Sequence, residues 1–272
     1  MDTVIVAVFV ICADILHAMR HQDDTRSQIS DAEVMTTAIV AMLYFSGNFE
    51  RSRIFLKEMG YIPKMLSKSR FNRRLHQVKP MFLNVFCILA ETWKDWNESS
   101  IYSIDTFPVP VCDNYRIRRC QIYQGDEYRG YVSSKKQYYY GIKLHLMVTE
   151  HGQPVEFFLT PASLADVSGL PYFDFDLPDG SKVYADRGYN LYFLEDVLQE
   201  AGITFQPMRK KNSKRPFPPW ICYLQHAFRK IIETTGSLLN QLFPKRIHAV
   251  TAQGFELKIV LFVLALSFQF FK

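Results

Sequence analysis

Apolar residues recur at one spacing in the first third of the chain and at another beyond it. In the first third, long apolar stretches are separated by polar segments, and their spacing predicts helices. These stretches cover residues 3–10, 34–45 and 81–93. Ser30 is followed three residues later by Glu33, the pattern of a helix-capping box. We therefore expect a helical region over residues 1–98.

From about residue 100, short apolar runs bounded by turns replace this pattern and predict strands. The runs cover residues 101–111, 138–149, 154–160, 182–185 and 203–208. Residues 150–153 would close a hairpin between the second and third strands, and a helix over 189–201 would lead into the fifth. Three antiparallel strands followed by a β-α-β unit predict an α/β fold, with a mixed sheet flanked by helices.

Two further helices are expected near the C-terminal end. Apolar positions repeat at helical spacing over about 221–243. The apolar run Ile259 to Phe271 has about 13 residues, short of the roughly 18 to 20 that cross a bilayer, so it reads as a buried helix. Near the start, the run from Val4 to Ala13 follows Asp2 rather than a basic residue, which disfavours a signal peptide. No membrane partner is expected.

The composition indicates a globular protein, because 48% of the residues are hydrophobic and can bury a large core. The five cysteines are scattered without a CxxC pair, which favours free thiols in a reducing cytoplasm. The net charge of +5 is concentrated in two clusters that suit a polyanion such as DNA, although a solvated helix face remains an alternative for each. The cationic residues concerned are Lys68, Arg70, Arg73 and Arg74, and Arg209, Lys210, Lys211, Lys214 and Arg215.

The first of these clusters falls in a segment that is amphipathic at helical spacing. Residues 67–76 predict a short helix with Phe71 and Leu75 on one face and cations on the other. This helix could act as the recognition helix of a helix-turn-helix motif.

Two aspartates occupy unusual places in the predicted strands. Asp105 lies inside the apolar run 101–111, where a buried charge needs a partner such as a metal ion. Asp186 follows the short run 182–185, and ligand-binding groups gather at such strand ends in α/β sheets. The structural alternatives are a turn aspartate that ends the strand for Asp105 and a helix cap for Asp186.

Glu233 lies four residues after Arg229 in the helix expected over 221–243, so an exposed helical salt bridge is its structural alternative. Taken together, Asp105, Asp186 and Glu233 would supply carboxylates from two strands and one helix. Such a set can hold two divalent cations about 3.5 to 4 Å apart, which activate a water for attack on a phosphodiester and stabilise the leaving 3′ oxygen. Mg²⁺ or Mn²⁺ suits all-oxygen ligands. His145 is a further candidate for this site, and a structural strand histidine is the stronger interpretation.

Several motifs resemble the DDE transposases of bacterial insertion sequences, specifically the insertion-sequence-982 type, through almost the whole chain. The segments that carry the resemblance are 29–34, 66–76, 104–109, 143–145, 184–189, 209–215 and 229–234. The resemblance implies that Asp105, Asp186 and Glu233 are the catalytic triad, on a ribonuclease-H-like fold that requires Mg²⁺. It further implies binding to the terminal inverted repeats of an element, strand cleavage and strand transfer, and action as a homo-oligomer on DNA.

These expectations divide the chain into a helical, helix-turn-helix-like DNA-binding region over 1–98 and a catalytic domain over 99–272. Arg229 is expected to contact DNA together with the two basic clusters. One departure from the family is Gly236, because a glycine would weaken the helix that carries Glu233 by roughly 1 kcal/mol relative to alanine. Two other functions stay open: an inactivated copy that binds DNA as a repressor, and a nuclease that hydrolyses DNA without joining strands.

Overall fold

The computed structural model describes residues 1–271. These residues form two compact units, one built from residues 1–89 together with those from 238 onward, and the other from residues 90–237. The chain enters the second unit through α5 (Lys79–Asp95) and leaves it through α8 (Pro219–Leu242). The residues from 238 onward thus group with the N-terminal helices and not with the sheet, whereas the expected boundary at residue 98 placed them with the sheet.

Helices build the first unit, as the spacing of apolar residues predicted. In chain order they are α1 (Asp2–Ala18), α2 (Asp31–Phe45), α3 (Phe49–Glu58) and α4 (Lys68–Gln77), followed much later by α9 (Ala252–Phe268). The predicted capping box is present, since Ser30 Oγ accepts from the backbone N–H of Glu33 and the Ser30 N–H donates to Glu33 Oε2 at 2.6 Å. α2 and α9 pack together and are buried over most of their length. Among the helices of residues 1–271, none combines the length and the apolar character that crossing a bilayer requires.

A six-stranded mixed sheet forms the second unit. Its strands are β1 (Ile101–Cys112), β2 (Arg129–Val132), β3 (Gln137–Thr149), β4 (Pro154–Pro161), β5 (Lys182–Ala185) and β6 (Thr204–Pro207). The order is β2-β3-β1-β5-β6, with β4 also paired to β3. β1, β2 and β4 run antiparallel to β3, whereas β5 is parallel to both β1 and β6. The five predicted strands and the hairpin are confirmed, and β2 is an additional strand.

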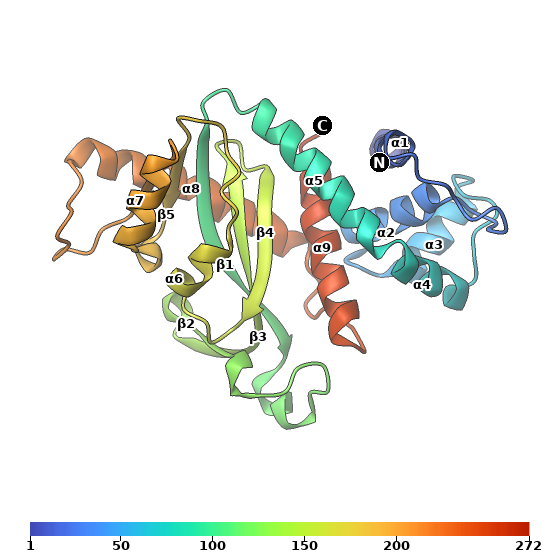
Figure 1. Cartoon of the computed structure of the whole chain (residues 1–272). Helices are drawn as coiled ribbons and strands as arrows, with labels where there is room; N and C mark the ends of the chain where they lie inside the picture. The colour runs from blue at the N-terminus through green and yellow to red at the C-terminus, as the bar shows by residue number, and fades with distance from the viewer. Residues whose placement is uncertain (272) are drawn as a thin grey trace. The chain divides into compact units, whose positions relative to one another are not determined.

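Helices cover both faces of this sheet, and Figure 1 shows α8 behind it and α6 (Asp166–Gly169) and α7 (Tyr192–Glu200) in front. On the α8 face, the ring of Phe228 stacks on Tyr184 of β5 with centroids 4.9 Å apart. On the opposite face, α6 reaches the strands through Gly169, where an added Cβ would lie 2.5 Å from His145. The fold is therefore the mixed α/β arrangement that the sequence predicted.

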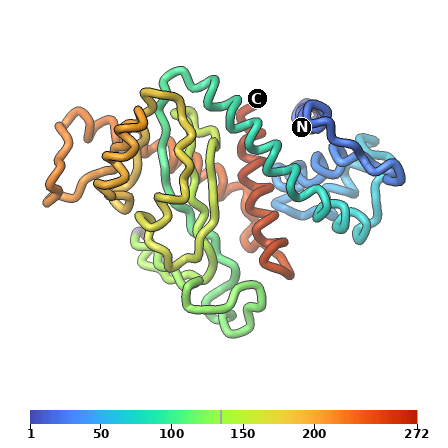
Figure 2. The backbone as a smooth tube through the Cα atoms, viewed as in Figure 1, coloured from blue at the N-terminus to red at the C-terminus, as the bar shows by residue number. Residues whose placement is uncertain are grey.

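The segment between β6 and α8 contains no helix or strand, and Figure 2 shows it as a wide loop. Pro216 and Pro218 fix the backbone and remove donors at its end, and Pro219 occupies the first position of α8, where proline is tolerated.

Candidate active site

β1 and β5 bring Asp105 and Asp186 together. The parallel register pairs Ile104 of β1 with Ala185 of β5. Asp105 and Asp186 are the next residues after this pair, so their side chains project to the same face. Both line one small cavity of about 10 Å³, which is closed by Gln225 and Arg229 of α8. A cavity of this size holds about one water molecule. A single pair of adjacent parallel strands thus brings together two carboxylates that are separated by 80 intervening positions in the sequence.

Asp105 lies in the middle of its strand, which continues to Cys112, so the alternative of a turn aspartate does not hold. The pKa of Asp105 is raised to about 7, mainly by burial and to a smaller extent by the neighbouring carboxylate of Asp186. Two groups lower it: the backbone N–H of Thr106, which donates to Asp105 Oδ1 at 2.8 Å, and the cation of Arg229. A buried carboxylate with so little compensation is a site that a cation would stabilise.

Arg229 connects the remaining two predicted carboxylates. Its Nη1 lies 3.1 Å from Asp186 Oδ1, and its Nε lies 2.9 Å from Glu233 Oε1 one helical turn away. The helical salt bridge weighed as the alternative for Glu233 is therefore formed, and it is part of a larger chain of charges. Within residues 1–271, the oxygens of Asp105, Asp186 and Glu233 do not all come within 4.8 Å of one another. Asp105 and Asp186 line the same cavity, whereas Glu233 is linked to Asp186 through the guanidinium of Arg229.

A group that does meet this distance lies in the first unit and consists of His21, Asp23 and Asp31. His21 Nε2 lies 2.8 Å from Asp31 Oδ2, and Arg74 of α4 lies 2.5 Å from Asp31 Oδ1. Since the guanidinium already neutralises Asp31, this group ties the loop before α2 to α4 and has no need of a metal ion.

The structure adds a fourth carboxylate to the neighbourhood of Asp105. Asp166, at the start of α6, accepts from Lys143 Nζ at 2.8 Å, and the same amino group donates to the carbonyl of Leu164 at 2.7 Å. The charge of Asp166 also contributes to the raised pKa of Asp105. No pattern in the sequence marks Asp166, because α6 is four residues long and its place depends on the tertiary fold.

His145 is a structural residue in the described fold. It is fully buried, its Nε2 lies 2.9 Å from Thr160 Oγ1, and its ring stacks on Phe158 with centroids 4.4 Å apart. Burial lowers its pKa to about 4, so the ring is neutral at physiological pH. His145 projects from the face of the sheet that α6 covers, whereas Asp105 projects from the opposite face.

Gly236 has a packing role that the sequence does not reveal. A Cβ at this position would lie 2.1 Å from Cε1 of Phe107 on β1, so glycine lets α8 approach the strand beside Asp105. We expected Gly236 only to weaken the helix, whereas the structure shows that the close contact with Phe107 requires a glycine at this position.

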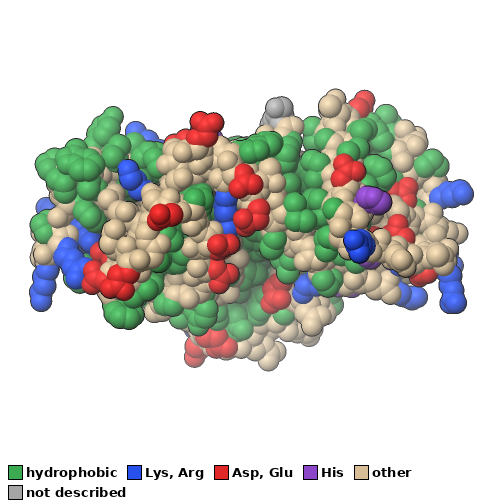
Figure 3. All heavy atoms as spheres, turned by 45° about the horizontal axis from the view of Figure 1, so that its top comes forward, with side chains coloured by type: hydrophobic (Ala, Val, Ile, Leu, Met, Phe, Trp, Pro, Cys, Tyr) green, Lys and Arg blue, Asp and Glu red, His purple; other side chains and the backbone are tan. Residues whose placement is uncertain are grey.

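The predicted DNA-contacting cations fall into two groups. Arg209 is only 7% exposed and pairs with Glu195, itself 8% exposed, at 2.5 Å; its guanidinium also lies 4.4 Å from the ring centroid of Phe217. Arg209 and Arg74 are therefore each engaged in a separate buried or half-buried ion pair, Arg209 with Glu195 and Arg74 with Asp31. Exposed cations are Lys68, Arg70, Arg73, Lys210, Lys211, Lys214 and Arg215, the last of which pairs with Asp196. On the face in Figure 3, basic and acidic side chains are interspersed, so the charge of +5 forms no single basic surface there.

With this geometry in place, comparison with known families gives a match to the model "Transposase DDE domain" over residues 96–246. The chain belongs to this family of DDE transposases. The match covers more than half of the chain and spans both strands of the aspartate pair and Glu233. This DDE transposase is accordingly an enzyme of DNA transposition.

A search of curated protein sequences found no match. Among solved structures, the transposase is similar to the piggyBac transposase in a cryo-EM structure of its synaptic complex with hairpin DNA. The two share 11% sequence identity, the alignment covers 98% of this chain and 72% of the other, and the TM-score is 0.46.

DDE transposases in general depend on metal ions. The residues of this transposase fit a hard divalent cation in two respects: Asp105 and Asp186 line the same cavity with carboxylate oxygens, and burial, which raises the pKa of Asp105, leaves its charged form poorly solvated without a cation. In the described conformation Arg229 supplies part of that counter-charge, so a cation would compete with its guanidinium.

Proposed function

We propose that Asp105, Asp186 and Glu233 are the DDE triad of this transposase, and that it cleaves and joins DNA strands at the terminal inverted repeats of an insertion sequence of the insertion-sequence-982 type. The observation that carries the proposal is the placement of Asp105 and Asp186 on adjacent parallel strands, with Glu233 linked to them through Arg229. A ribonuclease-H-like arrangement of the domain 99–272 would account for this placement.

In this proposal the three carboxylates hold one or two Mg²⁺ or Mn²⁺ ions. Bound cations would supply the positive charge that stabilises the attacking and leaving oxygens of a phosphodiester. Asp105 must lose its proton to bind a cation, and the nearby charge of Arg229 favours that loss. With a cation held by Asp186, the guanidinium of Arg229 would be free to contact the DNA, and its planar donors suit a phosphate.

The region 1–98 is proposed to bind DNA, with α4 as the recognition helix of a helix-turn-helix-like unit. Lys68, Arg70 and Arg73 are exposed on this helix, whereas Phe71 and Leu75 are buried and anchor it. The exposed cations of the loop before α8, Lys210, Lys211 and Lys214, are proposed to contact the DNA backbone. A homo-oligomer assembled on the two ends of the element completes the proposal.

The deciding experiment follows cleavage of labelled DNA that carries the ends of the element, with Mg²⁺ or with EDTA. It compares the natural chain with Asp186→Asn and with Asp176→Asn, an acid whose side chain is 86% exposed and pairs with Lys94. We expect metal-dependent nicking and joined products that Asp186→Asn abolishes and Asp176→Asn preserves. Binding without cleavage by the natural chain would indicate the repressor instead, and cleavage without joined products would indicate the nuclease.

A further inference from the structure

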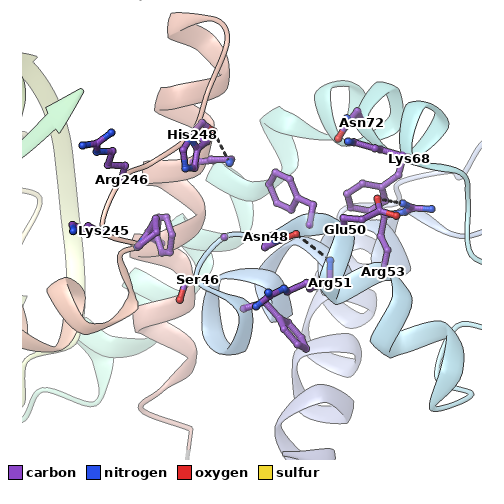
Figure 4. A pocket seen from close by; sticks show the side chains of 17 residues that line it. Ser46, Asn48, Glu50, Arg51, Arg53, Lys68, Asn72, Lys245, Arg246 and His248 are labelled. Atoms are coloured by element: carbon purple, nitrogen blue, oxygen red, sulfur yellow. Dashed lines mark hydrogen bonds and ion pairs between the residues drawn. The ribbon is translucent and has the colours of Figure 1, made fainter. Parts of the chain in front are cut away.

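A cavity of about 750 Å³ lies in the first unit. We call it the basic cavity. Its lining comes from the turn between α2 and α3, the start of α4, the segment 244–248 and α9, and Figure 4 shows Lys245, Arg246 and His248 on one side with Lys68 and Asn72 on the other. The volume falls within the roughly 300 to 1,000 Å³ typical of ligand sites.

Positive charge dominates this lining. Six lysines and arginines line the cavity against a single acid, Glu50, which already pairs with Arg53. The six are Arg51, Arg53, Lys68, Lys245, Arg246 and Lys258. Such an excess within one concave surface attracts an anion and disfavours a metal ion or a neutral apolar ligand.

Lys258 of α9 shows that part of this charge is held away from water. Its Nζ donates to the carbonyl of His248 at 2.6 Å and lies 5.3 Å from the ring centroid of Phe49. Burial lowers the pKa of Lys258, because its charged form is poorly solvated at this position. A phosphate placed in the cavity would replace the missing solvation.

Aromatic rings form the apolar part of the lining. Phe45 and Phe49 are half-buried at the turn between α2 and α3, and Phe71 and Phe262 are buried behind them. Gly47 allows this arrangement, because its φ of +76° turns the chain and an added Cβ would lie 3.0 Å from Phe262. Aromatic faces beside cations are the combination that binds a base together with its phosphate.

From these features we propose that the basic cavity binds one nucleotide of a DNA strand, with the base against Phe45 and Phe49 and its two flanking phosphates toward Lys68 on one side and toward Lys245 and Arg246 on the other. An acidic peptide would use the cations but leave the rings without a flat partner. The inference rests on the proposed function for the choice of DNA as the ligand. It assigns a role to the segment 244–248, which the family match reaches only at its margin.

Binding of labelled single-stranded oligonucleotides to the full chain tests the proposal. Phe49→Leu should weaken binding roughly tenfold, whereas Phe55→Leu, on the same helix but outside the lining, should not. Lys245→Ala should weaken binding about threefold or more and reduce its salt slope by about one, whereas Lys57→Ala, exposed on α3 and outside the lining, should leave both unchanged. Thermal melts establish that each variant is folded.

A 2-aminopurine base in the oligonucleotide reports on stacking directly. We expect its fluorescence to be quenched by the natural chain and by Asp186→Asn, and to recover with Phe49→Leu. Equal affinity of an abasic oligonucleotide, or full displacement by hexaglutamate at equal charge, would overturn the proposal. Because Asp186→Asn should bind the probe without cleaving DNA, failure of this inference and failure of the proposed function give different results.

Discussion

Arg229 Nη1 lies 3.1 Å from Asp186 Oδ1, so a guanidinium stands beside a carboxylate proposed to bind a divalent cation. Arg229→Gln removes the competing charge and should tighten Mn²⁺ binding to the protein without DNA. Partly exposed ion pairs contribute roughly 0.2 to 1 kcal/mol, so the dissociation constant should fall by up to about fivefold. Calorimetry measures this, with Lys230→Gln, exposed on the same helix, as the control. Unchanged or weaker Mn²⁺ binding in Arg229→Gln would contradict the competition.

Gly236→Ala should destabilise the protein even though alanine is the better helix former. The added Cβ would clash with Phe107, and overpacking of this kind costs about 1 to 3 kcal/mol. Urea unfolding measures the loss, and Ser237→Ala, exposed at the next position, should show none of it. Adding Phe107→Leu to Gly236→Ala should recover part of the stability. A more stable Gly236→Ala protein would show that the contact is not a constraint.

His145 makes stability depend on pH. Its pKa is about 4 when folded and near 6.5 when unfolded, so the unfolded chain binds the extra proton between these values. Its contribution is complete above pH 6.5 and is lost as the pH falls toward 4, by about 2 kcal/mol at pH 5. His145→Gln should show a smaller difference in the free energy of unfolding between pH 7 and pH 5. The matched variant His226→Gln, exposed on α8, should keep the natural difference; equal behaviour of the two would argue against the assignment.

Arg209 and Lys210 are neighbours that should behave differently. Arg209→Ala leaves Glu195 buried without its partner, which costs roughly 3 to 5 kcal/mol. Lys210→Ala changes an exposed residue and should leave stability unchanged while reducing the salt slope of DNA binding by about one. Urea unfolding and anisotropy titrations at several salt concentrations separate the two effects. A stable Arg209→Ala protein with weakened DNA binding would place Arg209 on the DNA surface after all.

The periodicity of apolar residues predicted most of the fold because long helices and buried strands repeat over many residues. The predicted helix over 67–76 and the strand over 182–185 correspond to α4 and β5 within one residue at each end. β2 was missed because it has four residues, lies at the sheet edge and contains Gly130. Backbone pairing with β3 holds residues 129–132 as a strand, although their own sequence does not predict one.

The candidate site was predictable where one residue breaks a local pattern, as Asp105 does within an apolar strand. It was not predictable where the environment comes from distant segments. Arg209 belongs to a cationic run, yet Glu195 and Phe217 enclose it from two other segments. The same holds for the basic cavity, whose lining joins the turn after α2 to residues two hundred positions later.

The packing of α9 against α2 sets an order of events during translation. α2 leaves the ribosome early, but the helix that covers it begins at Ala252, about 200 residues later. At a synthesis rate of about 5 to 20 residues per second, α2 waits roughly 10 to 40 s for its partner. A transcript broken before that point encodes the whole sheet but leaves the face of α2 that packs on α9 without its partner. Completion of the polypeptide is therefore a condition for assembling the helical unit.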